Sequence, residues 1–144
     1  MAGLLDLARR LEGKLEKLEQ SANTRVINAG IAVLRDLVGV TPVDTSKALS
    51  NWQVGLGQRP ISAIPAYVTG VKGSTRATSA EQAIAQGTAL LRSKKPGQTV
   101  YISNLTPYIK ELDTGSSRQF AGGFKARARI VARKVAGKGG VGFV

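Results

Sequence analysis

Apolar residues recur from Leu4 to Leu37 at a repeating 3,4,4 spacing, which matches a helix of about 3.67 residues per turn. Gly39 and Pro42 then supply a stop signal. At about 1.5 Å per residue this helix would be roughly 50 Å long, which exceeds the width of a domain of this size. We therefore expect either a break near residues 21–24 or a helix that extends beyond its own domain. An extended helix would expose apolar surface that only a neighbouring chain could cover. The stripe consists of Leu4, Leu7, Leu11, Leu15, Leu18, Ala22, Val26, Ala29, Val33 and Leu37.

The segment that follows this helix predicts a turn and then a strand. Pro42 fixes one φ angle, and the side chains of Asp44 and Thr45 can accept hydrogen bonds from backbone N–H groups two or three residues later, as in a turn or a helix N-cap. Residues 49–56 alternate polar and apolar positions, which indicates a strand. Trp52, the single tryptophan, lies on this strand and is expected in the core.

The middle of the chain predicts a long loop, a helix and a second strand. Residues 58–78 contain prolines and glycines without a durable period, and loops of this length in compact domains usually bind a partner or are ordered by one. Ser79 and Gln82 resemble a capping box, so a second helix is expected over residues 80–91. Residues 98–103 indicate a short strand.

The last third predicts a turn, a final helix and a tail. Residues 104–115 begin with a turn and hold one or two helical turns, and residues 119–135 predict a helix. Residues 137–144 are too rich in glycine to be helical. The apolar positions of the final helix fall within one arc of about 80°, and they are Phe120, Phe124, Ala128, Val131 and Val135.

The order of these elements predicts the fold class. Helix, strand, loop, helix, strand and helix follow one another in a chain of 144 residues, which suits one domain spanning residues 1–144. We expect an α+β fold in which a small antiparallel or mixed sheet packs against a long N-terminal helix and a C-terminal helix.

Composition excludes most catalytic chemistry. The chain has neither Cys nor His. It therefore has no thiolate nucleophile, imidazole base, Ser-His-Asp triad or zinc-finger site. Asp44, Glu111 and Asp113 could be considered as metal ligands, but each falls where a cap or a turn is expected. We expect a protein that is not an enzyme and has no catalytic residue, cofactor or metal.

Positive charge is concentrated at the C-terminal end. Lys and Arg number 21 against 9 Asp and Glu, and residues 118–144 hold seven bases and no acid. At 100° per residue four bases share one face of the last helix, whereas Arg127 and Lys134 fall nearly opposite. This face could follow phosphates in nucleic acid, dock on an acidic protein surface, or be a solvated helix face. The four are Arg118, Lys125, Arg129 and Arg133.

The N-terminal sequence carries acids and bases throughout and has no long apolar run. We therefore expect neither a signal peptide nor a membrane span, and synthesis in a cytoplasm.

Two segments resemble a known family when they are taken in order. The first is Thr41-Pro42-Val43-Asp44-Thr45, leading into Leu49-Ser50-Asn51-Trp52, and the second is Tyr101 to Gly115, with Asn-x-x-Pro-Tyr and Leu-Asp-x-Gly elements before a basic helix. Both are similar to elements of the tail-completion, or neck, proteins of tailed bacteriophages, over about residues 10–136. The chain departs from that pattern at Ser46, where the family usually has Gly, and at Asp113, where it has Glu.

The resemblance implies a structural protein of the virion without catalytic activity. Such proteins form a ring, usually six-fold, in the neck between head and tail. The implied partners are further copies of the chain, the head-side connector or stopper protein and the tail tube protein, with possible contact to genomic DNA and none to a membrane. A tail terminator ring of the same neck is an alternative, as is a nucleic-acid-binding module that uses the basic helix. We expect the loop at 58–78 and the tail at 137–144 to reach neighbouring subunits or rings.

Turns in the two segments are then expected to hold the ends of the sheet in shape. We expect the basic face to dock on an acidic surface of the next ring, because a strongly basic channel would hold back DNA as it leaves. The turn residues are Pro42, Asp44, Thr45, Asn104, Pro107, Tyr108, Asp113 and Gly115.

Overall fold

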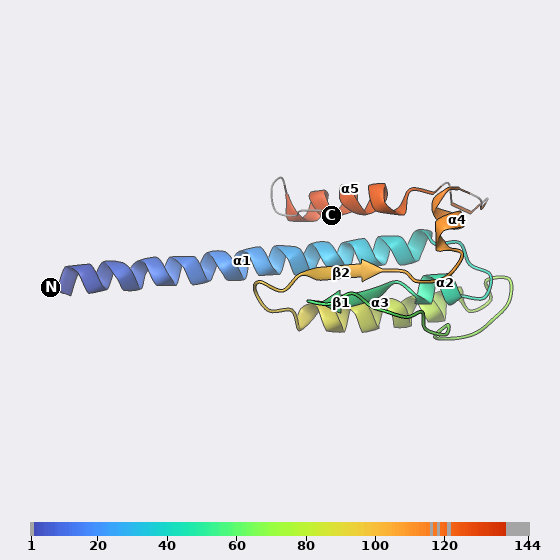
Figure 1. Cartoon of the computed structure of the whole chain (residues 1–144), viewed down its shortest axis with the longest axis horizontal. Helices are drawn as coiled ribbons and strands as arrows, with labels where there is room; N and C mark the ends of the chain where they lie inside the picture. Colours follow the sequence, from blue (N-terminus) through green and yellow to red (C-terminus); the bar gives the residue numbers. More distant parts are fainter. Residues whose placement is uncertain (1, 116, 118, 121, 138–144) are drawn as a thin grey trace.

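The computed structural model describes residues 2–115, 117, 119–120 and 122–137. They form an α+β fold in which a long helix, α1, runs through the centre of the molecule (Figure 1). The C-terminal helix lies on one side of α1, and a two-stranded sheet with α3 lies on the other (Figure 1). The elements are α1 (Ala2–Val40), α2 (Lys47–Ser50), β1 (Gln53–Leu56), α3 (Arg76–Arg92), β2 (Val100–Ser103), α4 (Ile109–Asp113) and α5 (Phe124–Ala136).

Helix α1 is continuous over 39 residues, so the expected alternative of a break at 21–24 is wrong. At 1.5 Å per residue it is about 58 Å long. Its N-terminal half projects beyond the rest of the molecule (Figure 1). We call residues 3–22 the arm and the described residues from 23 onwards the body. Asn23 marks the root of the arm, since its side-chain amide donates to the carbonyl of Lys94 (3.2 Å) and its Oδ1 accepts from the Lys94 amine.

The two strands pair antiparallel, with Gln53 opposite Ser103 and Leu56 opposite Val100. The strand expected over 49–56 is therefore correct only in its second half. Leu49 and the preceding residues form the short helix α2. Leu49 and Trp52 are three residues apart and both buried, which is the spacing of a helical turn, whereas residues three apart on a strand point to opposite faces.

Helix α3 begins four residues earlier than expected and does not use Ser79 as its cap. Ser79 lies inside the helix and is fully buried, and its Oγ accepts from the N–H of Val68 and donates to the carbonyl of the same residue, both at 3.0 Å. The capping-box interpretation is wrong because this hydroxyl binds the preceding loop instead of the helix start.

Helix α5 begins five residues later than expected. Gly122 and Gly123 precede it with positive φ angles of 94° and 82°, a conformation that favours glycine and interrupts a helix. Its buried face also differs from the expected one, since Ala132 and Ala136 are buried whereas Val135 is 44 % exposed. The face follows an i, i+4 row that starts at Phe124 and packs against α1.

The core lies along the second half of α1, where α2, α3 and α5 pack against it. Leu34 and Leu49 are fully buried, and the expectation that Trp52 belongs to the core is confirmed. The indole N–H of Trp52 donates to Thr41 Oγ1 (2.7 Å), and its ring meets Phe124 edge-to-face with centroids 5.1 Å apart. Trp52 thus links the end of α1 to the start of α5.

Candidate interaction surfaces

The two segments that carry the family resemblance lie against each other at one end of the molecule. The side-chain amide of Asn104 donates to the carbonyl of Ala48 (2.7 Å), and Tyr108 is hydrogen-bonded to the side chain of Thr45. Burial raises the pKa of the Tyr108 phenol, and its hydrogen bonds to Thr45 and to the backbone of Ala48 oppose that shift. The sequence placed these residues in two separate turns, and the structure joins them into one cluster.

The turn at 41–46 is also the anchor of the long loop. Asp44 Oδ1 accepts from the backbone N–H of Lys72 (2.7 Å), and the Asp44 carbonyl accepts from Gly73 N–H (2.8 Å). Ser46 is buried and its Oγ is hydrogen-bonded to Thr75 Oγ1 (2.9 Å). Asp44 therefore ties together segments about 28 residues apart and is not a helix cap.

Ser46 has an unusual backbone conformation. Its φ angle is +68°, in the left-handed region that glycine adopts far more readily than residues with a Cβ atom. This is the position at which the chain has Ser where the resembling family usually has Gly.

The remaining turn residues stabilise the backbone of the segment that leads into α5. Asp113 Oδ1 accepts from the N–H of Phe124 (2.7 Å), and the Asp113 carbonyl accepts from Gly123 N–H (3.0 Å). Gly115 has a φ angle of +89°. Pro42 is buried and Pro107 is exposed, each at the turn where the sequence placed it.

Asn51 and Ser50 are anchors that the sequence analysis missed. The Asn51 amide donates to the carbonyl of Ile64 and its Oδ1 accepts from the N–H of the same residue, both at 2.7 Å, as a strand partner would. Ser50 Oγ accepts from Tyr67 N–H (3.1 Å). The sequence signal that could have identified these anchors is the presence of two polar residues directly before the buried Trp52. The loop therefore lies against the body, and Ile61, 95 % exposed, is its most exposed large apolar residue.

The described residues contain no cluster suited to metal binding. No group of three or more acidic side chains among them is placed to hold a metal ion. Asp44 and Asp113 are occupied with backbone N–H groups, as described above. Ser93 Oγ donates to the Leu90 carbonyl (2.6 Å), so it does not point at the neighbouring Lys94.

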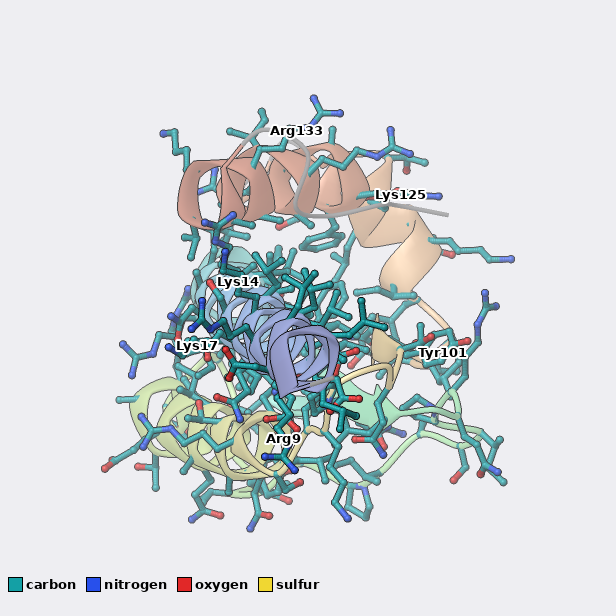
Figure 2. The ribbon with its side chains drawn as sticks, turned by 90° about the vertical axis from the view of Figure 1, so that its left-hand side faces the viewer. Arg9, Lys14, Lys17, Tyr101, Lys125 and Arg133 are labelled. Atoms are coloured by element: carbon teal, nitrogen blue, oxygen red, sulfur yellow. The ribbon has the colours of Figure 1, made fainter. Side chains whose placement is uncertain are left out.

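The basic face of α5 is exposed. Lys125, Arg129 and Arg133 are all exposed, and Figure 2 shows Arg133 on the side of α5 that faces away from α1 and Lys125 projecting sideways at one end of the helix. Arg127 faces the opposite way and forms a two-pronged ion pair with Asp36 of α1, with N–O distances of 2.5 and 2.9 Å. This hydrogen bonding to Asp36 raises the pKa of Arg127. Arg118 lies outside the described residues, as does the tail from residue 138.

The arm carries the second exposed surface. Leu4 is 72 % and Leu18 66 % exposed, and the three leucines of the stripe between them are 53 to 59 % exposed. The same stripe is buried in the body, where Ala29, Val33 and Leu37 are at most 6 % exposed. Of the two expected alternatives, a break or an extension beyond the domain, the structure has the extension, and the exposed part of the stripe lies on it.

No protein-family model, curated protein or solved structure matches this chain. Within the residues that the structure describes, no helix combines the length and the apolarity needed to span a membrane.

Proposed function

We propose that the protein is a structural component of the neck of a tailed bacteriophage, where copies assemble into a ring that joins the head-side connector to the tail tube. Head–tail joining of this kind requires no catalytic residue, cofactor or metal. Its partners are other copies of the chain, a connector or stopper protein and the tail tube protein.

The observation that carries this proposal is the contact between the two resembling segments. Short sequence similarities that arise by chance have no reason to meet in space, whereas Asn104 binds the backbone of Ala48 and Tyr108 binds Thr45. The left-handed Ser46 adds to this argument, because the position where the family usually has Gly has a backbone that favours Gly.

The exposed surfaces support assembly. A ring needs two different surfaces on each subunit that meet and close by rotation. The described residues offer the leucines of the arm, the tip of the loop at Ile61 and the basic face of α5. Exposed leucines in a continuous row are typical of a protein that is covered by another chain.

Native mass spectrometry and negative-stain microscopy of the purified chain test the ring directly. We expect a particle whose mass is several times that of one chain and which shows rotational symmetry. A monomer at high protein concentration would refute the ring. Absence of the protein from purified virions would refute the neck assignment. A tail terminator ring would give the same mass but would bind the tail tube in the absence of the connector.

A loop variant tests whether residues near Ile61 contact a neighbour. Ile61→Ser should leave thermal unfolding unchanged, because the side chain is 95 % exposed, but it should weaken the assembly. Val71→Ser, at a loop residue that is 69 % exposed near the Asp44 anchor, is the matched control. Equal effects of the two substitutions on particle mass would argue against a specific contact at the loop tip.

The exposed basic face of α5 supports a second candidate, a nucleic-acid-binding module. Stacking on bases is not available from Trp52 and Phe124, since both are buried. Binding by this face would rest on phosphate contacts of Lys125, Arg129 and Arg133, and it would weaken steeply as salt increases. Duplex binding by a monomer, lost in a variant with these three bases changed to Gln, would favour this candidate over the ring.

A further inference from the structure

The arm has an apolar face that the body leaves uncovered. Leu7, Leu11, Leu15 and Leu18 are all more than half exposed on one side of a continuous helix. The five stripe leucines together expose roughly the area of three whole leucine residues, on the order of 500 Å². Two such faces supply about 1,000 Å² of apolar surface, and the stems of flanking Lys and Glu side chains bring the total close to the 1,200 Å² of a small specific interface.

Net charge distinguishes the arm from the body. The arm holds four acids and four bases, whereas the remainder of the chain holds five acids and 17 bases. Two bodies therefore repel each other, while two arms do not. A second arm is the surface of this protein that matches the leucine row in length, apolar character and neutrality.

The charges beside the leucine row are sorted by sign. At 100° per residue, Lys14 and Lys17 lie about 60° and 120° to one side of the row, and Glu12 and Glu19 lie about 100° and 80° to the other. Figure 2, which looks along α1 from its N-terminal end, shows Lys14 and Lys17 projecting to the same side of the helix. Arg10 belongs to the basic flank and is ion-paired to Asp6 within the arm (2.9 Å).

This sorting selects the direction in which two arms can pair. When two helices pack parallel, the left flank of one faces the right flank of the other, so that the acidic flank meets the basic flank on both sides. In an antiparallel pair each flank meets its own kind, and acid would face acid and base would face base. Charge complementarity therefore favours the parallel arrangement.

We propose that the arm binds the arm of at least one further copy of this chain, parallel and leucine row to leucine row. The pairing rests on the homo-oligomeric part of the proposed function and adds the surface and the orientation. Parallel arms place the two basic bodies at the same end, but salt at about 0.15 M screens charges beyond roughly 8 Å, whereas the flanks meet at closer range. The 3,4,4 spacing keeps the rows in register with little supercoil.

Disulfide trapping tests the orientation, because the chain has no cysteine of its own. Leu7→Cys and Leu18→Cys are prepared as separate variants, oxidised mildly and run on a non-reducing gel. In a parallel pair each position faces its own copy, so each variant alone forms a covalent dimer. Gln20→Cys is the matched control, since it is exposed on the same helix about 180° from the row.

Three outcomes overturn the proposal. Cross-linking only when the Leu7→Cys and Leu18→Cys variants are mixed would show an antiparallel pair. Equal cross-linking of Gln20→Cys would show random collision. No cross-linking in a particle that is multimeric by native mass would show that the arms are not the interface, and would leave the proposed ring intact.

A second measurement separates the arm pairing from the neck assignment. Leu11→Ala together with Leu15→Ala removes the centre of the row and should reduce the native mass or raise the dissociation constant at least tenfold. Leu5→Ala, at a residue 65 % exposed about 120° from the row, should leave both unchanged. Equal effects of these variants would overturn the pairing. If the arms cross-link but the protein is absent from purified virions, the arm pairing stands and the neck assignment is refuted.

Discussion

Gly87 is a position at which α3 packs tightly against Leu34 of α1, and replacing it by alanine should destabilise the protein. A Cβ atom built there lies 2.2 Å from Leu34 Cδ2 and 3.2 Å from Val54 Cγ2. Ordinary contact begins near 3.4 Å, so Leu34 or the backbone of α3 must move by about 1.2 Å. Leu34 is fully buried, so its side chain can move only against other core residues.

Two opposing effects set the size of this change. Overpacking of a core costs about 1–3 kcal/mol and more where the neighbour cannot move, whereas alanine in place of glycine favours a helix by about 1 kcal/mol. We expect Gly87→Ala to lower the free energy of unfolding by about 1–2 kcal/mol, which corresponds to a fall in Tm of about 3–7 °C for a chain of this size. Urea unfolding followed by circular dichroism measures the difference.

Gly39→Ala is the matched control, because Gly39 is an exposed residue of α1 whose added Cβ atom would meet nothing within 4 Å. It should raise the free energy of unfolding by about 0.5–1 kcal/mol through helix propensity alone. Leu34→Ala alone should cost about 2–5 kcal/mol. Combined with Gly87→Ala it should cost less than the sum of the two, because the new methyl group fills part of the cavity. A Gly87→Ala protein as stable as the wild type, or strictly additive effects, would refute the close packing described here.

Three further predictions concern the contacts that hold the body together. Arg127→Lys keeps the charge but loses the two-pronged pair with Asp36, and since the Arg127 side chain is 46 % exposed we expect a loss of only about 0.5 kcal/mol in urea unfolding. Asn51→Ala removes the paired hydrogen bonds to the loop and should cost about 1–3 kcal/mol, with faster hydrogen exchange over residues 57–75 and unchanged exchange in α5. Desolvation lowers the pKa of Lys94 below the ordinary 10.5. Between that lowered pKa and 10.5, the unfolded chain therefore binds more protons at this residue than the folded chain does. Lys94 thus makes the free energy of unfolding increase as pH rises through this window. The difference between wild type and Lys94→Met should show this slope, and a difference that does not change with pH would contradict it.

The sequence predicted α1 well because helical periodicity depends only on the spacing of nearby residues. It did not predict which half would be buried, since Leu11 and Val33 belong to one uninterrupted stripe. Burial is decided by α3 and α5, which lie far along the chain. The extent of α1 is thus a local property, and its division into arm and body is a tertiary one.

The anchors of the loop were missed for a related reason. Local rules assign Ser79 to a cap and Asn51 to a strand, but their partners Val68 and Ile64 belong to a segment without periodicity. A buried Ser or Asn satisfies its hydrogen bonds wherever backbone groups are available, and this is known only once the loop is placed. The cluster at Asn104 and Tyr108 could be predicted as turns, but not as one site.

The continuity of α1 has a consequence for how the arm remains helical. The first turn of a helix is the unfavourable step in its formation, and each later residue adds one hydrogen bond for one residue fixed. The buried half around Leu34 and Leu37 supplies that first turn within the cooperative folding of the body, so the arm only has to elongate from Asn23 outwards. Opening of the helix then starts at the free end near Leu4 and advances towards the root. A segment that contributes no core is thereby presented to a partner already ordered, and binding loses less conformational entropy than it would with an unfolded tail.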